Sequence, residues 1–283
     1  MIPMLNINAT VGRHSAKNPC SPLSFQTAIR FFVFILLTVA APVFGQSQNT
    51  GASPASSSQA STPSTPEART YSSCHVDGPY VAMTFDDGPR PGTTTQLLDI
   101  LKQRNIKATF FMIGTNVVAH PEIARRVLAE GHEIGNHTWT HPQLSKLSNQ
   151  QVTEELTKTQ EAIKNACGFA PTLMRPPYGA ITKLQREWIE KQFGLNVILW
   201  SVDTNDWRRP GASVISQRII KGAQPGAIIL QHDIHQQTVD AMPAALDALL
   251  AKGFKFVTVS QLIAMNHPKP PSPPTPVSPT PEQ

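Results

Sequence analysis

Two adjacent carboxylates, Asp86 and Asp87, are the residues of this sequence best placed to do chemistry. They follow the run 80–85, which is mostly apolar and uncharged and predicts a buried strand that stops at Gly88 and Pro89. Two like charges buried side by side are costly unless a cation or a proton lies between them. One carboxylate that binds a metal and one that handles protons would remove that cost. Taken alone, the pair also fits a solvated strand end.

Two histidines four residues apart, His137 and His141, offer nitrogen ligands in the run HTWTH. On a turn or short helix both imidazoles can reach one ion, although the spacing alone also fits surface or packing histidines. The run lacks the glutamate that follows the first histidine of helical zinc proteases. With Asp87 the pair makes a set of two nitrogens and one carboxylate that leaves positions open on the ion. Zn²⁺ is the first choice, and Co²⁺, Ni²⁺ or Fe²⁺ would fit the same ligands.

Five motifs in this order and spacing resemble those of the polysaccharide deacetylase family, the NodB-homology group of metal-dependent carbohydrate N- and O-deacetylases, also called carbohydrate esterase family 4. They are TFDDGP at 84–89, HTWTH at 137–141, RPPYG at 175–179, DTNDW at 203–207 and LQH at 230–232. The resemblance covers about residues 81–262, and no motif departs from the family pattern. It therefore implies an active enzyme.

The resemblance also implies the catalytic roles. Asp86 would be the general base, and Asp87 would bind the metal with the two histidines of HTWTH. His232 would be the acid that protonates the leaving amine. Arg175 would hold the base in place, and the backbone N–H of Tyr178 would contribute to the oxyanion hole.

Three further positions take supporting roles by the same resemblance. Asp206 would tune either the arginine or the acidic histidine, and Asp203 competes for that part. Trp207 would form the aromatic wall of a sugar groove, and Leu230 would line a small acetyl pocket.

The activity that the resemblance implies is removal of N-acetyl groups from N-acetylglucosamine units of a polysaccharide, either peptidoglycan or a chitin-type oligosaccharide. O-deacetylation of acetylxylan, an esterase reaction, is the first alternative. A non-catalytic wall-binding module, tethered by a linker, is the second. We expect a monomer whose partner is the polysaccharide.

Composition sets limits on these hypotheses. Of 283 residues, 40% are hydrophobic and 15% charged, which suffices for a sizeable core. The formal charge is +5, but three of the 24 basic residues lie in the first 45, which leaves 21 against 19 acidic residues. No stripe of basic and aromatic residues follows, so we expect no nucleic-acid partner.

Residues 1–45 resemble a signal peptide or signal anchor, because the apolar run 31–45 follows Arg30 and ends in small residues. Fifteen residues rise only about 22 Å as a helix, short of the roughly 30 Å hydrocarbon core, which favours cleavage over a permanent anchor. We expect export to the periplasm, the cell wall or the medium, with membrane attachment only if the leader is uncleaved. In such an oxidising compartment the two cysteines beyond the leader, Cys74 and Cys167, predict a disulfide, with two buried thiols as the alternative.

The rest of the chain divides by composition. Residues 46–73 are rich in Ser, Thr, Ala and Pro and predict a disordered linker, and the Pro-rich residues 267–283 predict a disordered tail. Between them, residues 74–266 form one deacetylase domain. Strand-like runs at 80–85, 108–114, 133–137, 173–176, 196–202, 227–232 and 255–259 alternate with helical patterns at 93–103, 122–130, 149–166, 183–192, 213–221 and 239–251.

Such alternation of apolar strands and helices predicts a parallel sheet covered by helices. The α/β architecture that we expect is a single (β/α) barrel-like domain, distorted or incomplete, of seven or eight strands; a doubly wound open sheet is second. The polar motifs favour the barrel because each follows a different strand, and barrel enzymes gather their catalytic groups at the carboxyl ends of several strands.

Overall fold

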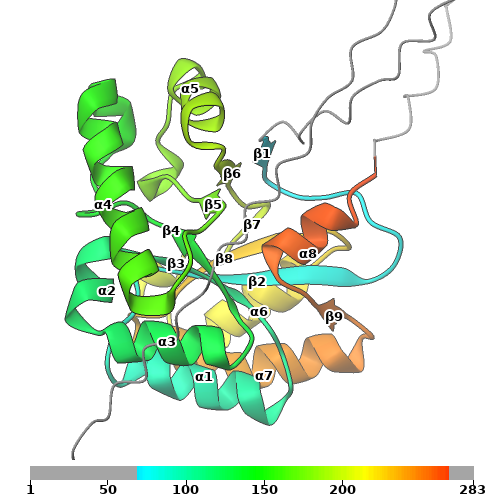
Figure 1. Cartoon of the computed structure of the whole chain (residues 1–283). Coiled ribbons are helices and arrows are strands. Elements are labelled where there is room, and N and C mark those ends of the chain that lie inside the picture. The colour runs from blue at the N-terminus through cyan, green and yellow to red at the C-terminus, as the bar shows by residue number, and fades with distance from the viewer. Residues whose placement is uncertain (1–68, 268–283) are drawn as a thin grey trace, which may run out of the picture. The chain divides into compact units, whose positions relative to one another are not determined.

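The computed structural model describes residues 69–267 (Figure 1). The expected leader, most of the expected linker and the expected tail beyond His267 lie outside the described residues. The predicted linker extends too far, because Thr70–Tyr71 already form strand β1, which pairs in parallel with β6 (Asn196–Ile198). The folded domain therefore includes at least five residues before Cys74.

The core of the domain is a parallel sheet with the strand order β1-β6-β5-β4-β3-β2-β8-β7, and β9 pairs with β2. The remaining strands are β2 (Tyr80–Asp86), β3 (Thr109–Met112), β4 (Glu133–Asn136), β5 (Leu173–Met174), β7 (Val202–Asp203), β8 (Ile228–His232) and β9 (Lys255–Phe256). Every ladder pair among them is parallel. The predicted distorted or incomplete (β/α) barrel is confirmed, since the sheet's end strands β1 and β7 do not pair with each other within residues 69–267.

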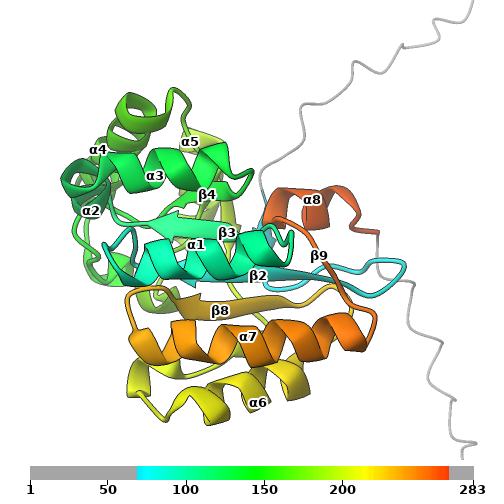
Figure 2. The same ribbon diagram turned by 90° about the horizontal axis from the view of Figure 1, so that it is seen from below.

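Helices connect the strands and cover the sheet. They are α1 (Thr93–Gln103), α2 (Gly114–Ala119), α3 (Pro121–Ala129), α4 (Asn149–Cys167), α5 (Lys183–Phe193), α6 (Ala212–Gly222), α7 (Gln236–Ala251) and α8 (Val259–Ala264). In Figure 2, α1 and α7 run alongside β2 and β8, and α6 lies next to α7. The expected capping box starts α4, where Ser148 and Gln151 bond each other's backbone. Within 69–267 no helix is both long and apolar enough to cross a bilayer.

One predicted strand, 196–202, is in fact two strands, β6 and β7, which lie at different places in the sheet. The backbone N–H of Leu199 donates to the carbonyl of Tyr71 beside β6, whereas that of Ser201 donates to the carbonyl of Ile228 in β8. The chain therefore crosses from one end of the sheet to the other within three residues. An apolar run cannot show this change of neighbours, because both halves are buried.

The carboxyl ends of parallel strands meet at one face of a barrel, and this places the motifs together. Asp86 ends β2, His232 ends β8, and His137 directly follows β4. Arg175 directly follows β5, and Asp206 begins the short 3₁₀ turn after β7. The predicted gathering of polar groups at this face is confirmed.

The predicted Cys74–Cys167 disulfide is wrong in this structure, because both cysteines are free. Cys74 is buried beside Ala82 and Ile228 in one part of the core, whereas Cys167 ends α4 and packs on a separate apolar cluster. The physical reason is this separate packing, which an even count of cysteines does not reveal.

Thiol mapping of the purified, unreduced chain tests this correction. After denaturation with an alkylating reagent, we expect the peptides that contain Cys74 and Cys167 each to carry the label. In the native state Cys167, which is partly exposed, should react faster than buried Cys74, because burial raises the pKa of the Cys74 thiol to about 11. A single disulfide-linked peptide pair in the mass spectrum would contradict the structure.

Candidate active site

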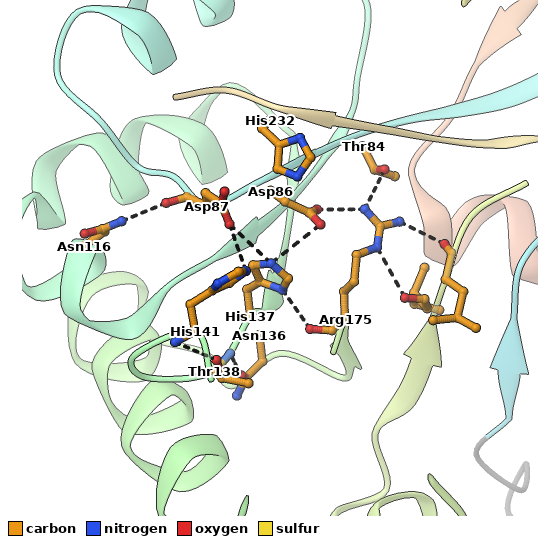
Figure 3. A network of polar contacts seen from close by, with 12 residues as sticks. Thr84, Asp86, Asp87, Asn116, Asn136, His137, Thr138, His141, Arg175 and His232 are labelled. Atoms are coloured by element: carbon orange, nitrogen blue, oxygen red, sulfur yellow. Dashed lines mark hydrogen bonds and ion pairs between the residues drawn. The ribbon is translucent and has the colours of Figure 1, made fainter. Parts of the chain in front are cut away.

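Three side chains form a metal-ligand set at the carboxyl face of the barrel. The Oδ1 atom of Asp87 lies 3.4 Å from Nε2 of His137 and 3.3 Å from Nε2 of His141. One ligand atom from each residue lies within 4.8 Å of the others. Figure 3 shows the two imidazoles and the carboxylate facing one another. These are the three ligands expected from the sequence.

The set fits a small divalent cation. Ligands bound at about 2.0–2.2 Å to a tetrahedral ion lie about 3.3–3.6 Å apart, which matches the two measured separations. Oδ1 of Asp87 is also buried without a hydrogen-bond partner, and a bound cation would compensate for this. Burial alone would raise the pKa of Asp87, but His137, His232 and His141 outweigh it and lower the pKa to about 2. The carboxylate is thus ionised and ready to bind metal.

The backbone holds the histidines in the orientation that a metal requires. Nδ1 of His137 lies 2.7 Å from the carbonyl oxygen of Arg175, so this ring directs Nε2 toward Asp87. The segment 137–141 is a turn, as expected, with positive φ angles at Thr138 and His141. The carboxylate of Glu155 accepts hydrogen bonds from two backbone N–H groups of this turn. An acceptor on α4 therefore fixes the ligand loop.

Asp86 is paired with a fully buried arginine. Its Oδ1 accepts a 2.7 Å hydrogen bond from Nη1 of Arg175, which is 0% exposed, and its Oδ2 lies 3.6 Å from Nε2 of His137. The guanidinium also donates to Oγ1 of Thr84 and to the carbonyls of Ile198 and Leu199. One oxygen of Asp86 is thereby anchored, and the other faces the ligand set.

His232 faces this set across the cavity and is bound to Asp206. Nδ1 of His232 lies 2.8 Å from Oδ1 of Asp206, and the His232 backbone N–H donates to Oδ2 of the same carboxylate. Burial opposes the charged imidazole, but Asp206, then Asp86 and Asp87, raise its pKa to about 9. The ring is therefore protonated at neutral pH, and its Nε2 is the free proton donor.

The geometry decides which group Asp206 contacts. It binds the histidine and not the arginine, and the Thr238 hydroxyl donates to it at 2.6 Å. Asp203, the competing residue, instead accepts from the backbone N–H of Asn205 at 2.7 Å and is exposed on the cavity wall. The alternative with Asp203 is not supported by this arrangement.

The three metal-ligand side chains, Asp86 and His232 line a cavity of about 360 Å³. Its walls also include Tyr178, Trp207 and Leu230, as expected, together with Pro176 and Trp200. The Tyr178 backbone has φ 61°, and its N–H has no acceptor in the described part of the chain. Trp207 is 50% exposed, whereas Leu230 is 4% exposed. An exposed aromatic surface beside a small apolar wall suits a sugar that carries an acetyl group.

Sequence reasoning missed several residues that support the site. Thr84 bridges Arg175 to the carbonyl of Ile229, and the amide of Asn116 donates to the carbonyl of Asp87. Trp200 lines the cavity from the segment that crosses between β6 and β7. Thr84 lies inside a motif and could have been found there, whereas nothing in the sequence connects Asn116 or Trp200 with the motifs.

Asp233, which follows the acidic histidine, is a second unexpected group. It is 0% exposed, its Oδ2 accepts a hydrogen bond from Thr94, and its Oδ1 has no partner. It packs so tightly on Gly88 that a Cβ atom there would overlap both carboxylate oxygens. Burial raises the pKa of Asp233 to about 7, although Thr94 acts in the opposite direction. The carboxyl group thus keeps its proton far above its usual range.

This raised pKa predicts how Asp233→Asn changes stability with pH. Between about pH 4 and pH 7 the folded chain binds a proton at Asp233 that the unfolded chain has lost, so stability falls as pH rises. Asparagine cannot titrate, so the variant should gain on the order of 2 kcal/mol relative to wild type between pH 5 and pH 7.

Urea unfolding of the metal-free protein at several pH values measures this difference. Asp240→Asn, which removes an exposed carboxylate from α7, is the control and should keep the wild-type pH dependence. Parallel stability curves for wild type and Asp233→Asn would show that Asp233 is ionised in the folded state.

Comparison with known proteins gives consistent matches. A family profile described as polysaccharide deacetylase matches residues 75–198. The peptidoglycan-N-acetylglucosamine deacetylase PgdA of Listeria monocytogenes is 44% identical over 182 residues, which is 64% of this chain and 38% of that protein. This chain therefore matches well under half the length of that relative.

Two further relatives match over most of their length. A chitooligosaccharide deacetylase of Bradyrhizobium is 42% identical over 197 residues, 64% of this chain and 90% of that protein. The crystal structure of the peptidoglycan N-acetylglucosamine deacetylase Bc1960, in complex with an N-hydroxybenzamide, superposes with a TM-score of 0.66 at 39% identity and covers 69% of this chain and 92% of that one.

Proposed function

Because this chain belongs to the polysaccharide deacetylase family, we propose that it is a metal-dependent hydrolase that removes N-acetyl groups from N-acetylglucosamine units of a polysaccharide and releases acetate. One observation carries the proposal. A three-ligand set, a carboxylate outside that set and a protonated histidine share one cavity: Asp87 with His137 and His141, Asp86, and His232.

Asp87, His137 and His141 would hold the ion, with Zn²⁺ as our first choice. When bound, such an ion lowers the pKa of a water molecule and polarises the acetyl carbonyl. Asp86 would take the proton from the attacking water. Its Oδ2 faces the ligand set, while Arg175 holds Oδ1 in place.

The other groups act on the acetyl carbonyl and on the leaving amine. The free N–H of Tyr178, held between Pro177 and Gly179 at the cavity wall, would donate to the oxyanion that forms at the carbonyl. His232 would then give its Nε2 proton to the departing nitrogen, because the amine leaves only when this nitrogen is protonated. Asp206 keeps that proton on the ring until it is needed.

The substrate class follows from the relatives. They are named as deacetylases of peptidoglycan N-acetylglucosamine and of chitooligosaccharides, so we propose one of these polymers for this chain. The catalytic roles that the sequence assigned are part of the proposal, as are export from the cytoplasm and action as a monomer.

Acetate release tests the proposed function. We expect the Zn²⁺-reconstituted protein to release acetate from peptidoglycan or N-acetylglucosamine oligomers, and faster than from acetylxylan. Asp86→Asn should still bind Zn²⁺ by calorimetry but lose roughly 10²–10⁴-fold in kcat, because it cannot accept the water proton. A higher rate on acetylxylan would make the chain an esterase, and comparable activity in Asp86→Asn would contradict the role of the base.

The pH profile tests the acid. The activity of wild type should fall on the alkaline side as His232 loses its proton, at or below about pH 9. In Asp206→Asn the charge that raises the pKa of His232 is gone while its burial remains, so this limb should move roughly 1–2 pH units lower.

Steady-state kcat measured against pH separates this effect from a structural one. Asp203→Asn is the matched control, since Asp203 lines the same cavity without contacting His232, and its alkaline limb should stay in place. If Asp206→Asn lowers kcat equally at every pH, Asp206 does not set the protonation of His232.

A further inference from the structure

Two hollows adjoin the catalytic cavity in succession. The first, of about 370 Å³, shares Asp87 and His141 with the catalytic cavity. The second, of about 430 Å³, shares Arg90 and Ile234 with the first. A chain of sugars that places its acetyl group at the metal ligands can therefore extend through the first hollow and bring a substituent into the second. Of the five motifs, only TFDDGP and HTWTH contribute residues to the first hollow, and none contributes a residue to the second.

The second hollow is rich in cationic and neutral hydrogen-bond donors. Its walls are formed by Arg90, Thr93, Arg209, Ile234, His235, Gln236 and Gln237. No carboxylate is among these residues. A hollow that carries two arginines and no acid attracts an anion.

Both arginines have donors to spare. Nη1 of Arg90 donates to the carbonyl of Ile234 at 3.2 Å, which directs the side chain along the hollow and leaves its other N–H groups available. The guanidinium of Arg209 makes no hydrogen bond and no ion pair with any group in residues 69–267. Both side chains belong to exposed residues, so a ligand can reach them.

Asp87, which lines the first hollow, belongs to the metal-ligand set, and three other acids neighbour residues of the two hollows. Glu122 lies 3.8 Å from Nδ1 of His120 at the far wall of the first hollow. Asp240 accepts from the amide of Gln236, and Asp233 is buried beneath with a raised pKa. Burial lowers the pKa of His235, and His232 and Arg209 add to this effect although Asp206 opposes it. Among the residues that line the second hollow, the two guanidinium groups are therefore the only permanent charges.

We propose that Arg90 and Arg209 form a carboxylate-binding site for an acidic branch on a sugar next to the one that is deacetylated. A planar guanidinium presents paired N–H donors that match the two oxygens of a carboxylate. Peptidoglycan carries such acids, on the lactyl and peptide branches of alternate sugars, whereas a chitin-type chain is neutral. The inference rests on the proposed function and refines it, since it makes the branched, anionic glycan the preferred substrate.

Kinetics with two substrates of equal sugar number test the site. One is a neutral N-acetylglucosamine oligomer, and the other is a soluble peptidoglycan fragment with its peptide branches intact. We expect Arg90→Gln/Arg209→Gln to raise KM for the branched fragment about 10-fold or more, since hydrogen bonds to charged groups are lost. The kcat for this fragment and both constants for the neutral oligomer should stay within about twofold. Added salt should also lower the ratio of the wild-type kcat/KM for the branched fragment to that for the neutral oligomer, because it screens the charge of the two arginines.

A matched pair controls for overall charge. Arg125→Gln/Arg186→Gln removes the same charge from α3 and α5, outside all three hollows, and should leave the preference unchanged. The proposal is overturned if Arg90→Gln/Arg209→Gln keeps the wild-type ratio of kcat/KM values for the two substrates. It is also overturned if kcat/KM falls equally for the two substrates in that variant, or if Arg125→Gln/Arg186→Gln lowers kcat/KM for the branched fragment by the same factor.

Binding measured without turnover separates this inference from the proposed function. In the Asp86→Asn background, calorimetry with the branched fragment should show about 10-fold weaker binding when Arg90 and Arg209 are both replaced. If wild type releases no acetate from either substrate, the proposed function fails. The dissociation constants then still show whether Arg90 and Arg209 bind the branched fragment. Equal affinities with and without the two arginines would refute it.

Discussion

The buried ion pair between Arg175 and Asp86 is the interaction on which the rest of the site depends. Removing an arginine from water is tolerable only when its donors are satisfied. Here four hydrogen bonds reach Asp86, Thr84 and two carbonyls, one in the last residue of β6 and one in the residue that follows it. The guanidinium also lies over the ring of Phe111 at 4.2 Å. Arg175 thus contacts three parts of the site. Its side chain binds Asp86 and the segment that begins at the end of β6, and its backbone carbonyl binds the ligand His137.

Environment, more than residue type, separates the tasks of the acids and histidines in this small space. Three imidazoles hold Asp87 ionised, whereas burial without a countercharge keeps Asp233 protonated. Burial first, and then His137, lower the pKa of His141, as suits a neutral metal ligand, while Asp206 raises that of His232. Opposite shifts among neighbouring groups thus keep a proton on His232 at a pH where Asp87 is ionised and His141 is neutral.

The reactive cavity and the neighbouring hollows differ in origin. The cavity is built mainly from the motifs that make this chain a polysaccharide deacetylase, and relatives that act on different glycans match the same region. The cationic hollow is built from the residues that follow TFDDGP, DTNDW and LQH. Reaction chemistry and choice of polymer can therefore vary independently, because only the second depends on those connecting residues.

Residue type and order alone were enough to predict the alternation of strands and helices and the incomplete barrel. They also singled out Asp87, His137 and His141, which the fold brings together. Apolar periodicity and motif spacing are local properties, and parallel strands necessarily bring their carboxyl ends to one face. Tertiary structure decided the rest. It divided 196–202 between two strands with different neighbours and kept Cys74 apart from Cys167. It also joined Asp206 to His232 and brought Arg90 and Arg209 to the wall of one hollow. Each of these features depends on which segments, far apart in the sequence, pack against each other. A local pattern of residues does not specify such packing.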